Sequence, residues 1–226
     1  MNRPGNTNPE RGKTLVLVLI LINTVFVAAV SALQVDANIR ANQANRDSQY
    51  YAIQVTGSLI QSGAQSEYDM NTFAKWLTNT QEALVAGYSA LQRQTVNDSS
   101  GSERLTLESQ IYQAQADQAK KISLLFTDPA YAPTSDQGTP NFKTYMSALY
   151  AYSNELVLKQ NKASDSYHRW SNKSDSYVAV LTVMAIAFFL LGVAQMAQPR
   201  IRFLFSTFAA SVIGIGIIWA MILMII

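Results

Sequence analysis

The chain has 226 residues, of which 49% are hydrophobic and only 14% are charged; its net charge is +2, and it contains no cysteine. An average soluble domain has about 25% charged residues, so this composition favours a membrane protein. The small net charge argues against a nucleic-acid partner, and the lack of cysteine excludes disulfides and thiolate metal sites.

The N-terminal part of the chain predicts a tail followed by a first membrane span. Residues 1–13 are rich in Asn, Pro and Gly and carry basic side chains, which is typical of a disordered basic tail. Residues 14–34 form an apolar run of about the 20 residues that cross a bilayer core. A cleaved secretory signal is the alternative, because a basic tail precedes the apolar run and small residues lie near its end, at 30–32. Asn23, near the middle of the run, is expected to hydrogen-bond a neighbouring helix.

The segment 35–176 has hydrophobic residues at helical spacing and no strand-like alternation. It predicts a four-helix bundle outside the membrane. The first helix continues from span one and ends at Gly63. The second begins at Ser66, with Asp69 three residues later as in a capping box, and ends near Val96. The apolar face of this second helix consists of Phe73, Leu77, Thr80, Leu84 and Leu91.

The third and fourth helices of the predicted bundle are separated by a long loop. The third helix begins at Ser100, with Glu103 at capping-box spacing. Residues 128–140 contain three prolines and are predicted to be a loop. The fourth helix begins near Asn141 and meets no helix breaker before Gly192, so we expect it to continue into span two. The apolar positions of the third helix are Leu107, Ile111, Ala114, Ile122 and Leu125.

The C-terminal part predicts two further spans, residues 177–197 and 203–226, joined by a short basic loop at 198–202. A buried hairpin of a soluble protein is the alternative, but two uncharged runs of this length are hard to bury in a chain of this size. Ser206, Ala210 and Gly214 repeat small residues every four positions. This spacing predicts a face that another helix can approach closely, although small residues are common in spans generally.

No residue of the chain is predicted to be catalytic, metal-binding or cofactor-binding, and no cofactor is expected. His168 is the only histidine, and a single histidine cannot complete a zinc site of three or four ligands. Tyr167, Trp170 and Tyr177 flank span two and predict an aromatic belt in the headgroup zone. The spans contain no Asp, Glu, His or Cys, which disfavours an intramembrane enzyme.

The charge distribution predicts the orientation. The tail and the 198–202 loop carry five basic residues against one acidic residue, whereas residues 35–175 carry twelve basic and fourteen acidic residues. The positive-inside rule therefore places the N-terminus in the cytoplasm and residues 35–176 outside it. We expect a multi-pass protein of a plasma (inner) membrane.

The order of these parts resembles a group of uncharacterised bacterial membrane proteins with one N-terminal span, a polar helical insert and two C-terminal spans. The resemblance is carried by residues 165–182 (DSYHRWSNKSDSYVAVLT) and by residues 198–202 (QPRIR). It implies this architecture and no catalytic residue. The insert is also similar to the ligand-binding modules of chemoreceptors, in which a four-helix bundle lies between two spans.

These observations predict an all-α integral membrane protein with three transmembrane helices and a four-helix bundle between the first and second. The expected function is that of a non-enzymatic accessory or scaffold subunit. Its expected partners are the lipid bilayer and either further copies of itself or a larger membrane complex. The alternative is a sensor or ligand-binding module, with a ligand near Trp76, Tyr145 and Tyr152.

Overall fold

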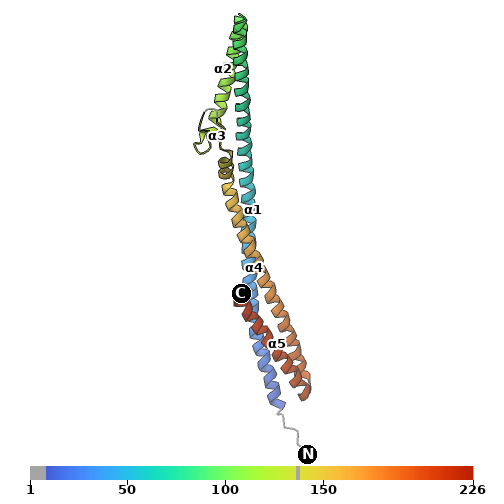
Figure 1. The fold of residues 1–226 in the computed structure, drawn as a ribbon. Helices are drawn as coiled ribbons and strands as arrows, with labels where there is room; N and C mark the ends of the chain where they lie inside the picture. The colour runs from blue at the N-terminus through green and yellow to red at the C-terminus, as the bar shows by residue number, and fades with distance from the viewer. Residues whose placement is uncertain (1–8, 136–137, 226) are drawn as a thin grey trace, which may run out of the picture. The chain divides into compact units, whose positions relative to one another are not determined.

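The computed structural model describes residues 9–135 and 138–225, and within these ranges the chain forms helices and no strand. The all-helical prediction is confirmed. Three of the helices are long and apolar enough to cross a membrane, as predicted. The helices, shown in Figure 1, are α1 (Pro9–Thr95), α2 (Ser99–Ile122), α3 (Leu124–Thr127), α4 (Phe142–Met196) and α5 (Pro199–Ile225).

The chain divides into two compact units. The membrane unit comprises Met1–Gln49 and Gln160–Ile226, and the hairpin unit comprises Tyr50–Lys159. Helices α1 and α4 each contribute residues to both units. The membrane unit contains the largest hydrophobic core, in which buried residues of α1, α4 and α5 pack together.

The predicted break at Gly63 is wrong, because α1 continues through it as a single helix of 87 residues. Gly63 does not adopt a positive φ, so it does not form a helix C-cap. The capping residues predicted for a second helix have other partners: Ser66 Oγ contacts Met146 Sδ at 3.7 Å, and Asp69 accepts hydrogen bonds from other helices. A glycine within a helix costs about 1 kcal/mol, which these contacts with α4 and α3 can offset.

The hairpin unit is therefore built on one long helix with a partner that returns in two pieces (Figure 1). Helix α2 packs on the C-terminal part of α1, where Ser109 Oγ donates to the Ala83 carbonyl oxygen at 2.7 Å. The first half of α4 packs on the part of α1 that precedes this contact in the sequence, where the hydroxyls of Ser58 and Ser153 lie 2.7 Å apart. The predicted neighbourhood of the first and fourth helices is confirmed, but the structure does not show a bundle of four helices.

The helix boundaries follow from local capping. α1 ends at Thr95, close to the predicted position, and Asn97 adopts a left-handed φ of 61°. The N-cap of α2 is Asp98, whose Oδ1 accepts from the Gly101 N–H at 3.0 Å, so the helix begins one residue before the predicted Ser100. A carboxylate accepts this hydrogen bond at a helix N-terminus at least as well as a hydroxyl does.

The remaining boundaries concern the spans. The prediction that the helix starting near Asn141 continues unbroken into span two is confirmed by α4. α5 begins at Pro199, so most of the predicted 198–202 loop is helical, with proline at the favoured first position. α1 begins at Pro9, so residues 9–13 of the predicted disordered tail are helical. The rest of that tail, residues 1–8, lies outside the described residues.

The continuity of α1 predicts that Gly63→Ala stabilises the protein. An added Cβ at Gly63 meets no atom within 4 Å, and alanine in a helix is favoured over glycine by about 0.5–1 kcal/mol. The measurement is thermal unfolding of the full chain in detergent, followed by circular dichroism.

Gly101→Ala is the matched control for this substitution, because the added Cβ would collide with the capping carboxylate of Asp98. We expect it to lower the unfolding midpoint. A lower midpoint for Gly63→Ala would contradict the continuous helix.

Candidate functional site

A buried carboxylate joins three helices in the middle of the hairpin unit. Asp69 of α1 is fully buried. Its Oδ1 accepts hydrogen bonds from Ser123 Oγ at 2.7 Å and from the Leu124 N–H at 2.9 Å. Its Oδ2 accepts from Gln65 Nε2 at 2.7 Å and from the Tyr145 hydroxyl at 2.8 Å. Four donors thus surround one carboxylate, and only Gln65 belongs to the same helix.

Local backbone geometry brings these donors to Asp69. Ser123 separates α2 from α3 with extended backbone angles, φ −104° and ψ 134°. Its hydroxyl donates to Asp69 and accepts from the Leu125 N–H at 3.2 Å, so it caps α3 and binds the carboxylate at once. At the start of α4, Asn141 Oδ1 accepts from the Thr144 N–H at 3.1 Å. This cap starts the helix so that Tyr145, in its first turn, reaches Asp69.

The electrostatics of the cluster are those of a structural carboxylate. Burial raises the pKa of Asp69, but the hydrogen bonds from Gln65, Ser123, Tyr145 and the Leu124 N–H together lower it below its ordinary value. Burial, together with the adjacent Asp69, raises the pKa of Tyr145, which keeps its hydroxyl protonated as a donor. Because both carboxylate oxygens are occupied and buried, this arrangement holds helices together and offers no open acceptor to a substrate.

An aromatic cluster packs beside this carboxylate. The Phe73 ring centroid lies 5.4 Å from that of Trp76 and 5.1 Å from that of Phe142, and Trp76 lies 5.0 Å from Phe126. Lys120 Nζ lies 5.6 Å from the Trp76 ring centroid, within reach of a cation–π interaction. The cluster connects α1 to the end of α3 and the beginning of α4.

The residues predicted to surround a ligand do not come together. Trp76 is packed in the aromatic cluster and Tyr145 is bound to Asp69, whereas Tyr152 is exposed. Sequence reasoning missed the role of Asp69. Its spacing from Ser66 resembles a capping box, and nothing in the sequence connects it to Ser123 or Tyr145.

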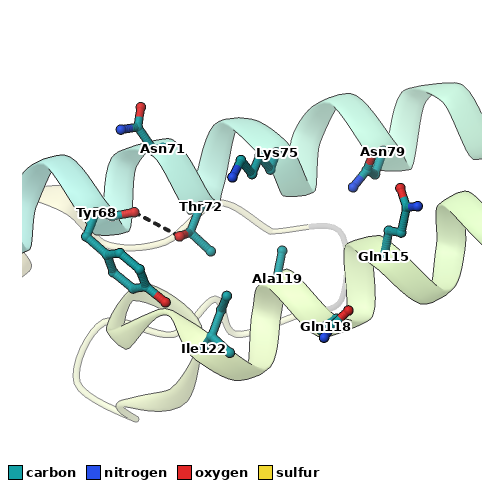
Figure 2. A pocket seen from close by; sticks show the side chains of 9 residues that line it. All are labelled: Tyr68, Asn71, Thr72, Lys75, Asn79, Gln115, Gln118, Ala119 and Ile122. Atoms are coloured by element: carbon teal, nitrogen blue, oxygen red, sulfur yellow. Dashed lines mark hydrogen bonds between the residues drawn. The ribbon is translucent and has the colours of Figure 1, made fainter.

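A groove of about 350 Å³ lies between α1 and α2 in the same unit (Figure 2). Its lining is mostly uncharged and polar, and Lys75 supplies its only charge. Figure 2 shows the Tyr68 ring extending from α1 toward Ile122 of α2. The lining consists of Tyr68, Asn71, Thr72, Lys75, Asn79, Gln115, Gln118, Ala119 and Ile122.

In the membrane unit, Asn23 is fully buried and connects α1 to α4. Its Nδ2 donates to the Met184 carbonyl oxygen at 3.2 Å. Its Oδ1 has no hydrogen-bond partner among the described residues. An amide that faced lipid would be costly, and Asn23 instead packs against α4.

The small residues of α5 have two different environments. Ser206 is buried and donates to the Arg202 carbonyl oxygen at 2.6 Å. Ala210 is exposed, and an added Cβ at Gly214 meets no atom within 4 Å. Gly216 makes the close approach within the chain, since an added Cβ would collide with the Met184 methyl group. Sequence reasoning passed over Gly216, although it repeats the glycine at 214.

The aromatic residues predicted to form a belt, Tyr167, Trp170 and Tyr177, differ in their surroundings. Trp170 lies beneath two cations, with Arg40 Cζ at 4.8 Å and Lys173 Nζ at 5.5 Å from its ring centroid. Tyr177 is only 2% exposed and belongs to the core of the membrane unit. The Tyr167 ring lies 5.2 Å from the ring of the exposed His168.

Arg202 has a structural role in addition to its charge. Its Nε donates to the Ala194 carbonyl oxygen at 3.2 Å, and its terminal nitrogen donates to the Ala197 carbonyl oxygen at 3.0 Å. These carbonyl groups lie at the C-terminal end of α4, where a cation is favoured by the helix dipole. The guanidinium group thereby fixes the turn between α4 and α5.

No group of three or more His, Cys, Asp or Glu side chains that could hold a metal ion occurs among the described residues. No protein-family model matches the sequence, and neither a curated protein nor a solved structure is similar to it.

The carboxylate cluster predicts a stability that depends on Asp69 and on pH. Asp69→Asn places an amide NH₂ group against a donor, and we expect a loss of about 2–4 kcal/mol, since hydrogen bonds to charged groups contribute about 1.5–3 kcal/mol. Because folding lowers the pKa of Asp69, its contribution is complete above the ordinary pKa of about 3.9 and is lost as the pH falls below it.

The measurement is the thermal unfolding midpoint of the full chain in detergent between pH 6 and pH 3. The wild type should lose stability over this interval more steeply than Asp69→Asn. Asp117→Asn, which changes an exposed carboxylate of α2, is the control and should keep the wild-type slope. Equal slopes for wild type and Asp69→Asn would contradict the structural role of the charged form.

Proposed function

We propose that the chain is a non-enzymatic accessory or scaffold subunit of a membrane complex. The observation that carries this proposal is the continuity of α1 and α4, each of which contains an apolar stretch long enough to cross a membrane and a polar stretch in the hairpin unit. A continuous helix transmits position and rotation from one stretch to the other more faithfully than a flexible linker does. Such a protein can join a partner of the hairpin unit to the membrane without a flexible linker.

The proposed orientation has the N-terminus in the cytoplasm of a plasma (inner) membrane and the hairpin unit outside. It is supported by the basic residues Lys13, Arg200 and Arg202 near the ends of the apolar helices. The lateral contact is proposed to involve α5, where Ala210 is exposed and an added Cβ at the half-buried Gly214 would meet no atom within 4 Å. Helices in lipid associate where small residues allow a close approach.

The proposal predicts that the protein purified from its own membrane in a mild detergent has a mass greater than one chain. Gly214→Leu should reduce that mass or weaken the association at least tenfold, because the new side chain would hold a neighbouring helix away. The measurement is light scattering of the purified complex, with correction for bound detergent.

Gly192→Leu is the matched control, since Gly192 lies in an apolar stretch of α4 and also has no atom near an added Cβ. It should leave the mass unchanged. A wild-type protein that is monomeric and carries no other protein would remove the main support for a scaffold role.

A second candidate function, that of a sensor or ligand-binding module, is favoured by the groove between α1 and α2. The amides of Asn71, Asn79, Gln115 and Gln118 present both donors and acceptors, and Tyr68 adds an aromatic ring. Amides and an aromatic ring suit a neutral ligand rich in hydroxyl or amide groups, such as a saccharide.

The prediction for this candidate is binding of chitotriose to the full chain, measured by isothermal titration calorimetry in detergent. Asn71→Ala with Gln118→Ala should weaken binding at least tenfold, because two amides of the groove are lost. Gln110→Ala, an exposed amide of α2 outside the groove, should not change it. Absence of binding, or equal binding by all variants, would count against the groove as a saccharide site.

A further inference from the structure

Helix α1 carries an apolar row that the chain itself leaves uncovered. Leu77, Leu84 and Leu91 follow one another at seven-residue spacing and keep 41%, 69% and 61% of their surface exposed. Tyr88, four residues after Leu84, is 67% exposed. Contiguous exposed apolar surface of this kind marks an interaction site in a soluble segment.

The row follows the heptad pattern of a coiled coil. Steps of four and three residues alternate along it, which places leucine at the d position of three successive heptads. Gln81 occupies one a position, where a polar residue typically fixes the register between two helices. The residues of this row, here called the leucine stripe, are Met70, Ala74, Leu77, Gln81, Leu84, Tyr88 and Leu91.

The other faces of this part of α1 are either covered by α2 or charged. Helix α2 covers the face that carries the buried Ala83, Ala86 and Ala90. A third face carries the exposed and charged Glu82 and Arg93, as expected of a face in water. The leucine stripe lies on neither face and is available for a partner outside the chain.

The scarcity of charge around the leucine stripe permits a second copy as that partner. Glu82 is the only charged residue between positions 76 and 92, and it lies off the stripe. The positions that flank the stripe, which include Thr78, Thr80, Val85 and Gly87, are uncharged. Two identical stripes can therefore approach each other without repulsion between like charges, and the cores of protein interfaces are poor in charge in the same way.

We propose that the leucine stripe is a homodimer interface in which α1 of one copy pairs in parallel with α1 of a second copy. Two chains inserted in one membrane in the same sense run parallel, so a two-fold axis brings each residue of the stripe to its own counterpart. This direction rests on the proposed membrane insertion, whereas the pairing does not require the α5 contact. Leu84, Tyr88 and Leu91 each keep more than 60% of their surface exposed, and such surface can contribute to the ~800 Å² per partner that a stable interface buries.

The test uses the absence of cysteine from the chain, so that each introduced cysteine is unique. Leu84→Cys and Leu91→Cys, in full-length protein in membrane vesicles, should each form a disulfide-linked homodimer on mild oxidation. A disulfide requires Cα atoms within about 7 Å, which the paired stripe provides and the charged face does not. Glu82→Cys is the matched control and should give at least tenfold less dimer.

Equal cross-linking at positions 82, 84 and 91, or a product that contains a different protein, would overturn the homodimer. Gly214→Cys separates this inference from the proposed function. If cysteine at 214 cross-links and cysteine at 84 does not, the membrane contact stands and the stripe interface is wrong.

A second variant tests the same surface without a disulfide cross-link. Because Leu84 is exposed within its own chain, Leu84→Glu should leave the helicity of the protein unchanged while placing two negative charges together in the dimer. We expect at least a tenfold weaker dimer by light scattering in detergent. An unchanged mass with unchanged helicity would contradict the proposal.

Discussion

The burial of the Asp69 carboxylate constrains the hairpin unit more than any other single feature. A buried carboxylate without partners is very costly, and four hydrogen bonds, from α1, α3, α4 and the Ser123 cap between α2 and α3, offset that cost together. The helix break at Ser123, the N–H of Leu124 at the start of α3 and the start of α4 are therefore mutually dependent. If any one of them shifted, a buried donor or the carboxylate would lose its partner.

The same carboxylate explains why the returning limb is interrupted between α2 and α4. The first piece, α2, must end where Ser123 and Leu124 can donate to Asp69. The second piece, α4, must begin where Tyr145 can donate to the other oxygen. The connection between them is tied down at its end, where the Asn141 N–H donates to the Tyr131 carbonyl oxygen at 2.8 Å. A continuous returning helix could not present both sets of donors to one carboxylate.

The membrane unit is held by contacts of a different kind. In lipid, burial of apolar surface gives little reason for helices to associate, so close packing and hydrogen bonds take its place. Gly216 allows α5 to approach Met184, and Asn23 donates to the backbone of α4 at the same residue. Arg202 satisfies carbonyl groups at the end of α4, where the chain turns into α5.

Sequence reasoning predicted the features that depend on long runs of residues. The three apolar stretches, the end of α1 and the unbroken α4 are read from composition and from the absence of breakers. Sequence reasoning failed where the effect of one residue on a helix depends on its conformation or on a tertiary partner. Gly63 is a terminator only if its φ becomes positive, and Ser123 interrupts a helix without proline or glycine because its hydroxyl has a tertiary partner. Such partners lie more than 50 residues apart and leave no local pattern.

The leucines of α1 show the limit of periodicity most clearly. Their spacing predicts a contact face, and we assigned that face to the core of a four-helix bundle. In the chain itself, α2 packs instead against Ala83, Ala86 and Ala90, using its own Ala116 and Ala119 near Trp76. Small residues allow two helices to approach closely within a thin hairpin, and the larger leucines then point elsewhere. Periodicity thus identifies an apolar face, but it does not tell what covers that face.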